Sequence, residues 1–230
     1  MSVQLPLGIR LRPDATFASF VPGRNAEAVD FLRNRFDAGQ MLYIWGGTGT
    51  GKTHLLHAAC QAVSAAGGSV VYLPFARIDE LAPEMLDGLE SLSLICMDDV
   101  EHIAGHEAWE RRVFGLFNAV RERSGRLLAA ANAAPRSLGL SLPDLATRFG
   151  WGLVFQLQPL GDEDLGAALA GRARALGIDL PDEVTRYLLQ RFARDVTALF
   201  ALLDRLDRES LSAQRRLTVP FVRSVIERGR

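Results

Sequence analysis

Up to residue 158, the hydrophobic positions of the chain follow two alternating patterns. Short continuous apolar runs bounded by glycine or polar residues are typical of buried strands, and the stretches between them carry apolar residues at helical spacing. The predicted strands are residues 41–45, 69–73, 94–97, 127–131 and 153–157. Helices are predicted from Asn25, from Thr53 and from Ala108. Because strands that alternate with helices form parallel sheets, the pattern predicts an α/β core with a five-stranded parallel sheet flanked by helices.

The pattern changes after Pro159. Leucine-rich helical patterns follow one another over residues 162–176, 181–192 and 195–209, and no strand is predicted between them. Thr218 is placed to open a last short helix. These segments predict a small C-terminal α-helical domain over residues 159–230, after an α/β domain over residues 14–158.

The first residues, MSVQLPLGIRLRP, combine alternating apolar positions with residues that disfavour regular structure. Pro6 and Gly8 are unfavourable inside a helix, and Pro13 interrupts a strand. We therefore predict that residues 1–13 are an extended, flexible peptide. Such a peptide is either a loose terminus or a segment that inserts its apolar side chains into another protein.

The composition limits the class of protein. The chain has 230 residues, of which 48% are hydrophobic and 23% charged, as expected of a globular protein with a large core. A formal net charge of −1 means that DNA binding would need a local patch. Cys60 and Cys96 lack the spacing of a zinc site or a disulfide framework, which predicts reduced core residues. Because the sequence shows neither a secretory signal nor a membrane-spanning run, we expect a cytoplasmic protein without a membrane partner.

The strongest chemical signal is the segment GGTGTGKT, residues 46–53, which fits the P-loop pattern G-x-x-x-x-G-K-[ST] and lies between a predicted strand and a predicted helix. The backbone N–H groups of such a loop turn inward around an anion, and the helix start adds its positive dipole end. Lys52 is expected to contact the β- and γ-phosphates of a nucleotide, and the Thr53 hydroxyl to bind Mg²⁺. The predicted nucleotide contacts are Gly46, Gly47, Thr48, Gly49, Thr50, Gly51, Lys52, Thr53 and His54.

Two carboxylates, Asp98 and Asp99, follow the predicted strand 94–97. A P-loop protein needs a carboxylate at the end of such a strand, near the metal ion. We therefore predict that Asp98 binds Mg²⁺ and that Asp99 polarises the attacking water. The alternative is that these residues cap a following helix, because Asp is a favoured N-cap residue.

Together these features resemble an AAA+ nucleotide-binding module with a helical lid. Residues 17–25, FASFVPGRN, resemble the segment that borders the adenine pocket in the bacterial replication initiator DnaA, which implies that Phe20 and Val21 contact the nucleotide. Residues 145–152, LATRFGWG, resemble the DnaA segment with the arginine finger, and Arg148 matches the finger. The resemblance gives Asn132 the sensor-one role, and a turn-forming asparagine is an equal alternative.

DnaA continues beyond its lid into a helix-turn-helix DNA-binding domain, whereas this sequence ends at Arg230. The sequence is therefore similar, over nearly its whole length, to the Hda family of DnaA homologues that switch the initiator off. In that family a peptide of pattern Gln-Leu-x-Leu-Pro-Leu binds the DNA polymerase III sliding clamp, the beta subunit. The matching residues here are Gln4, Leu5, Leu7 and Ile9, with Gly8 in place of the proline.

The resemblance implies a negative regulator of chromosome replication initiation. Such a protein binds ADP (or ATP) with Mg²⁺, is held on the DNA-loaded clamp by its peptide, and stimulates hydrolysis of the ATP bound to DnaA. Arg148 would act in trans on that ATP. DNA would be reached only through the clamp. Whether the chain hydrolyses ATP itself, and whether it forms homo-oligomers, is left open.

One position departs from the AAA+ pattern. Lids of this class usually present a sensor-two arginine, but Thr197 stands at the expected position, and Arg194 lies one turn earlier. A lid without that arginine should sense the γ-phosphate poorly, which agrees with an ADP-bound protein. Two other functions are open: a DnaA-like or helicase-loader AAA+ ATPase that acts on DNA with its own ATP, and a small-molecule kinase, since a P-loop alone excludes neither.

Overall fold

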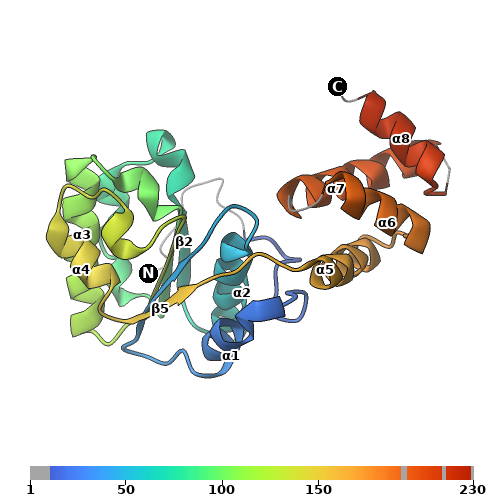
Figure 1. Cartoon of the computed structure of the whole chain (residues 1–230). Coiled ribbons are helices and arrows are strands. Elements are labelled where there is room, and N and C mark those ends of the chain that lie inside the picture. Colours follow the sequence, from blue (N-terminus) through green and yellow to red (C-terminus); the bar gives the residue numbers. More distant parts are fainter. Residues whose placement is uncertain (1–10, 193–195, 214–215, 229–230) are drawn as a thin grey trace.

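A five-stranded parallel sheet forms the centre of the α/β domain (Figure 1). The computed structural model describes residues 11–192, 196–213 and 216–228. The strands are β1 (Met41–Trp45), β2 (Val70–Pro74), β3 (Leu94–Asp98), β4 (Leu127–Ala131) and β5 (Leu153–Gln156), in the order β2-β3-β4-β1-β5. β1 lies between β4 and β5, so the end of β1, where the P-loop begins, lies beside the end of β4. The predicted parallel sheet is confirmed, with strand ends that differ by one residue in β2, β3 and β5.

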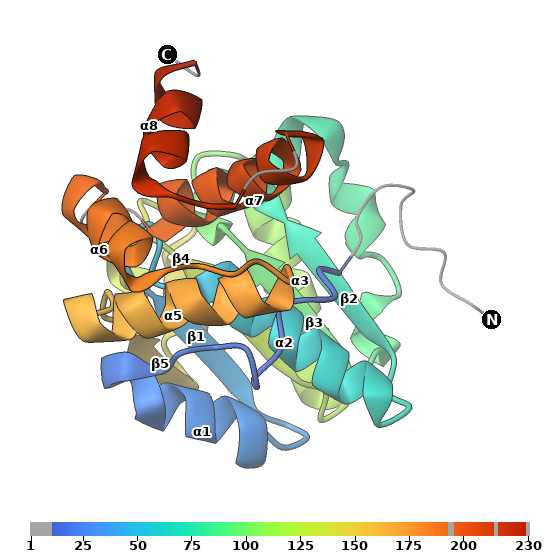
Figure 2. The same cartoon turned by 90° about the vertical axis from the view of Figure 1, so that its right-hand side faces the viewer.

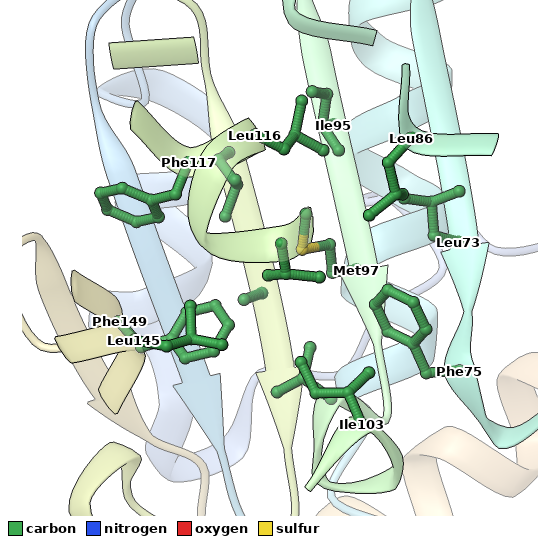
Figure 3. Packing of buried hydrophobic residues seen from close by; sticks show 14 of the residues in the cluster. Leu73, Phe75, Leu86, Ile95, Met97, Ile103, Leu116, Phe117, Leu145 and Phe149 are labelled. Atoms are coloured by element: carbon green, nitrogen blue, oxygen red, sulfur yellow. The ribbon is translucent and has the colours of Figure 1, made fainter. Parts of the chain in front are cut away.

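Helices cover both faces of the sheet (Figure 1). One face packs against α1 (Ala26–Asn34) and α2 (Lys52–Ala65), and the other against α3 (Glu107–Glu122) and α4 (Pro143–Phe149). Figure 3 shows the second interface, in which Phe117, Leu145 and Phe149 lie on the strands. The two faces form separate apolar clusters because strand side chains alternate between them.

Short 3-10 helices fill several connections. Three of them, Phe75–Glu80, Pro83–Leu86 and Leu89–Ser91, join β2 to β3. The others are Gly23–Asn25, Val100–Ile103 and Pro135–Ser137. None of these segments, nor α4, is predicted from the sequence, because elements of three to seven residues are too short to show a helical period.

The C-terminal helices form a lid with its own core. They are α5 (Asp162–Ala175), α6 (Asp182–Arg191), α7 (Val196–Ala213) and α8 (Val219–Glu227). Buried residues such as Leu169, Leu188 and Val222 join them into one apolar cluster. Thr218 caps α8 as predicted, since its hydroxyl accepts a hydrogen bond from the N–H of Phe221. No helix within the described residues is long and apolar enough to cross a membrane.

Two sets of polar contacts lie near the junction of the α/β domain and the lid, and the first holds Gln158, the last residue of the α/β domain. The buried side chain of Asn25 donates to the Gln158 carbonyl at 2.9 Å and accepts from the Gln158 N–H at 2.7 Å. Arg172 on α5 pairs with both Asp14 and Asp204. Asp14 belongs to residues 11–20, which we call the strap. The strap therefore joins the lid to the rest of the molecule (Figure 2).

Candidate nucleotide-binding site

The predicted P-loop connects β1 to α2, as the motif requires. Gly51 adopts φ +92°, a conformation that L residues avoid, and a Cβ there would lie 2.5 Å from the ring of Phe20. At Gly46 a Cβ would lie 2.5 Å from the carbonyl oxygen of Leu157. The glycines thus allow both Phe20 and the segment after β5 to approach the loop closely.

Lys52 lies at the start of α2 with its ammonium turned back over the loop. Its Nζ donates to the carbonyl of Gly46 at 2.7 Å and to that of Gly47 at 3.1 Å. The side chain is buried, and it is the only lysine in the sequence. Lys52 therefore lies against the loop with which a P-loop lysine holds phosphates, and its contact with phosphates stays a prediction.

Asp98 ends β3 as a buried carboxylate, 1% exposed. Its Oδ2 accepts a hydrogen bond from the hydroxyl of Tyr72 at 2.7 Å, and its Oδ1 accepts from the N–H of Asp99 at 3.2 Å. Both donors are neutral, and no salt bridge to Asp98 is found among the described residues. A buried carboxylate with neutral partners is suited to a cation, and hydroxyl and carboxylate oxygens such as those of Thr53 and Asp98 are ligands that Mg²⁺ prefers.

Asp99 has a left-handed backbone conformation, φ 54° and ψ 47°, which is uncommon for a residue other than glycine. It precedes the 3-10 helix Val100–Ile103 but makes no side-chain capping bond, and Asp98 lies within β3, so the helix-capping alternative is not supported. Burial, together with the carboxylates of Asp98 and Glu101, raises the pKa of Asp99 to about 6. The carboxyl is therefore ionised only above a pH of about 6.

Glu101 is a residue of the site that the sequence reasoning misses. Its carboxylate accepts a hydrogen bond from the N–H of Asn132 at 3.3 Å, and burial followed by the charge of Glu101 raises the pKa of Tyr43. The contact joins the 3-10 helix that follows β3 to the exposed Asn132, which directly follows β4. Only the position of Glu101 after the Asp98-Asp99 pair could have indicated this contact.

The strap packs on α2 beside the P-loop. Nε2 of His54 lies 2.8 Å from the carbonyl oxygen of Thr16, and its ring meets the ring of Phe20 edge-on at 5.2 Å. Burial lowers the pKa of His54. The side chain of His54 therefore faces the strap, so a contact of this residue with a nucleotide would come from its backbone. Phe20 and Val21 are both half-buried, and their contact with adenine stays a prediction.

The lid reaches the P-loop through the first residues of α7. A Cβ on Gly49 would lie 3.6 Å from Cβ of Val196 and 3.8 Å from the hydroxyl oxygen of Thr197. Thr197 thus lies beside the loop at the place where an arginine is expected. Arg194 and the predicted clamp-binding residues Gln4, Leu5, Leu7 and Ile9 lie outside the described residues.

Arg148 lies across the sheet from α2, on the face that packs against α3 and α4. Its guanidinium carbon is 3.7 Å from the centre of the Trp151 ring and 5.3 Å from that of Phe114. Arg121 also lies over the Trp151 ring, at 4.8 Å. Nη1 of Arg148 is buried and has no hydrogen-bond partner within the described part of the chain. The structure therefore brings Lys52, Thr53 and Asp98 to one end of the sheet and keeps Arg148 apart from them.

Two family models match the sequence: the bacterial DnaA ATPase domain over residues 11–156 and the Hda lid domain over residues 162–226. Domain III of the replication initiation protein DnaA from Thermotoga maritima has a similar structure, with a TM-score of 0.82, 21% identity, and 95% of this chain and 98% of that chain covered. A replication initiator DnaA bound to AMPPCP and single-stranded DNA has a TM-score of 0.71 and 25% identity, with 86% and 66% covered. The Thermotoga maritima RuvB Holliday junction branch migration motor shares the fold at a TM-score of 0.62 and 18% identity, with 87% and 64% covered.

Proposed function

The chain belongs to the AAA+ family of bacterial DnaA ATPase domains and carries an Hda-type lid, and from this we propose that it is a regulator that inactivates DnaA. The combination of these two parts in one chain carries the proposal. In the proposed reaction the protein binds ADP and Mg²⁺ in its own P-loop and stimulates hydrolysis of the ATP bound to DnaA. It is a negative regulator of replication initiation.

The residues of the nucleotide site support the proposed binding of ADP and Mg²⁺. Lys52 and the loop N–H groups would hold the phosphates, Phe20 and Val21 would border the adenine, and Thr53 and Asp98 would bind Mg²⁺. A DnaA of Aquifex aeolicus with this fold binds AMPPCP. ADP is favoured here because Thr197 brings no positive charge to the position of a γ-phosphate.

The position of Arg148 supports a role in the hydrolysis of ATP bound to DnaA, a different protein chain. Arg148 belongs to α4, which packs on the opposite face of the sheet from the P-loop helix, so the sheet separates it from that helix. The guanidinium lies over the rings of Trp151 and Phe114, and its Nη1 is buried, so the proposed contact with phosphate oxygens would use the other nitrogens of the group. An arginine finger supplied by a partner accelerates nucleotide hydrolysis by roughly 10³ to 10⁵ fold.

The N-terminal peptide is the proposed tether. Gln4, Leu5, Leu7 and Ile9 would enter pockets of the sliding clamp, and the clamp would hold the protein near DNA. This role does not need a basic surface, which agrees with the net charge of −1. We place the peptide at residues 1–13, the nucleotide-binding domain at 14–158 and the lid at 159–230.

The test measures hydrolysis of DnaA-bound ATP in the presence of DNA-loaded clamp. We expect the full chain with ADP to stimulate hydrolysis. Arg148→Ala should abolish the stimulation while clamp binding and ADP binding remain. Leu5→Ala with Leu7→Ala should abolish clamp binding while ADP binding remains. Arg136→Ala, which removes the same charge from an exposed arginine in the 3-10 helix before α4, is the matched control and should stimulate normally.

Stimulation by Arg148→Ala equal to that of the unmodified protein would refute the arginine-finger role. A chain that leaves DnaA-bound ATP intact but hydrolyses its own ATP when DNA is added would instead be a DnaA-like or helicase-loader ATPase.

A further inference from the structure

Three buried side chains from different elements lie in contact behind the proposed Mg²⁺ ligands. They are His57 on α2, Tyr72 on β2 and Asp98 at the end of β3, with exposed fractions of 3%, 8% and 1%. Their contacts run from the P-loop helix to the carboxylate across two strands. The proposed function uses Asp98 and gives no role to His57 or Tyr72.

The hydroxyl of Tyr72 fixes the orientation of the Asp98 carboxylate. It donates to Oδ2 at 2.7 Å, while the N–H of Asp99 donates to Oδ1 at 3.2 Å. With one donor on each oxygen, the carboxylate plane cannot rotate without losing a hydrogen bond in a buried place, which is costly. Each oxygen keeps a further lone pair for a cation.

His57 in turn packs against Tyr72. The two rings lie 4.2 Å apart at an interplanar angle of 31°. His57 is four residues after Thr53, so the two side chains share one face of α2. The Tyr72 ring therefore packs against the helix that supplies one proposed Mg²⁺ ligand, and its hydroxyl bonds to the other.

We propose that Tyr72 is a positioning residue for the Mg²⁺ of the bound nucleotide, whose hydroxyl aims the Asp98 carboxylate at the cation while His57 holds the phenol ring in place. The inference rests on the proposed function in one respect, that Asp98 is a metal ligand. Partners that hydrogen-bond to ligating side chains commonly change metal affinity by 10- to 100-fold when they are removed.

Tyr43 offers a matched control. It is also a buried sheet tyrosine, 1% exposed, but its hydroxyl donates to the carbonyl of Ala133 at 2.8 Å and not to a carboxylate. Tyr43→Phe and Tyr72→Phe each remove one buried hydroxyl and its hydrogen bond. A loss of metal affinity confined to Tyr72→Phe therefore cannot come from a general cost of removing a hydroxyl.

The experiment measures the affinity of full-length, ADP-saturated protein for Mn²⁺, an analogue of Mg²⁺ that binds the same oxygen ligands. The electron paramagnetic resonance signal of the free ion reports how much Mn²⁺ is unbound. We expect Tyr72→Phe to weaken Mn²⁺ binding about tenfold, and Tyr43→Phe to leave it unchanged. ADP binding in EDTA should be the same in both variants and in the unmodified protein. Asp98→Asn should weaken Mn²⁺ binding at least as much as Tyr72→Phe, and adding Tyr72→Phe to it should cause no further loss.

If Tyr72→Phe does not fold, His57→Ala replaces it, with an expected loss of a few fold in Mn²⁺ affinity because the phenol ring loses its support. Unchanged Mn²⁺ binding by Tyr72→Phe alongside a loss in Asp98→Asn overturns the inference and leaves the proposed metal site standing. Unchanged Mn²⁺ binding by Asp98→Asn overturns both the inference about Tyr72 and the proposed metal site. Equal losses in the two tyrosine variants also overturn the inference, because the effect is then one of stability.

Discussion

Gly46 and Gly47 are adjacent in the sequence, but a side chain would meet different surroundings at the two positions. At Gly46 a Cβ would lie 2.5 Å from the backbone oxygen of Leu157, which cannot move without disturbing the segment that follows β5. At Gly47 no atom lies within 4 Å. We expect Gly46→Ala to lower the free energy of unfolding by roughly 1–3 kcal/mol, because overpacking beside backbone forces a shift. Gly47→Ala should change it by less than about 0.5 kcal/mol.

Urea unfolding of both variants without nucleotide measures this difference. Equal free energies of unfolding for Gly46→Ala and Gly47→Ala would show that the segment after β5 does not press on the loop.

The raised pKa of Asp99 predicts a pH-dependent stability. Since burial and two neighbouring carboxylates raise this pKa to about 6, the native state binds a proton more tightly than the unfolded chain does. The ionised carboxylate is therefore unfavourable in the native state, and its contribution to stability falls as the pH rises from about 4 to about 6. We expect Asp99→Asn, which tolerates the left-handed backbone, to be more stable than the unmodified protein at pH 7.

Thermal unfolding in EDTA from pH 4 to pH 8 checks this expectation. The stability gained by Asp99→Asn should grow up to a pH of about 6 and then stay constant. A gain that is the same at all pH values would contradict a titration of Asp99.

At the level of elements, the connection between α4 and β5 supplies an aromatic ring to Arg148, the proposed arginine finger near the end of α4. Trp151 follows α4, is half exposed, and stacks on Arg148 at 3.7 Å. Because a cation–π contact contributes up to about 2 kcal/mol, we expect Trp151→Ala to lower the stimulation of DnaA ATP hydrolysis roughly tenfold. Trp151→Phe keeps an aromatic face and should retain most of the stimulation. The assay of DnaA-bound ATP measures both, and full stimulation by Trp151→Ala would show that Arg148 does not need the stack.

The elements that the sequence predicts are those with enough residues to show a period. The strands and long helices are confirmed, and Thr218 is confirmed as a cap. α4 and the 3-10 helices are too short to show a hydrophobic period, so the sequence does not predict them. Among site residues, Lys52, Thr53 and Asp98 belong to local motifs and are brought to one end of the sheet, whereas Tyr72 and Glu101 contact residues that lie far away in the sequence. Their roles depend on sheet order, which one sequence does not state.

On the scale of the whole molecule, Arg172 connects the strap, α5 and α7 through Asp14 and Asp204. The strap also bonds to α2, because Gln61 donates to the carbonyls of Arg12 and Ala15 at 2.6 and 2.8 Å. These contacts connect the lid to the segment next to the proposed adenine pocket.

We expect Arg172→Gln to speed backbone hydrogen exchange in residues 11–20 and to accelerate ADP dissociation several fold, since the strap loses its link to the lid. Arg174→Gln, the same change at an exposed position of the same helix, is the control and should alter neither. Hydrogen exchange by mass spectrometry and stopped-flow nucleotide release measure the two effects. Unchanged exchange in Arg172→Gln would mean that α2 alone holds the strap.

The single lysine of the sequence has a consequence for covalent chemistry. All other side chains of fixed positive charge are arginines, so a reagent that acylates primary amines has one side-chain target, and that target is the ammonium at the P-loop. Acylation removes its charge and blocks its hydrogen bonds in one step. The fraction of chains labelled at Lys52, measured by mass spectrometry, would thus give the fraction of molecules in which this ammonium is unprotected. A bound nucleotide is expected to lower that fraction.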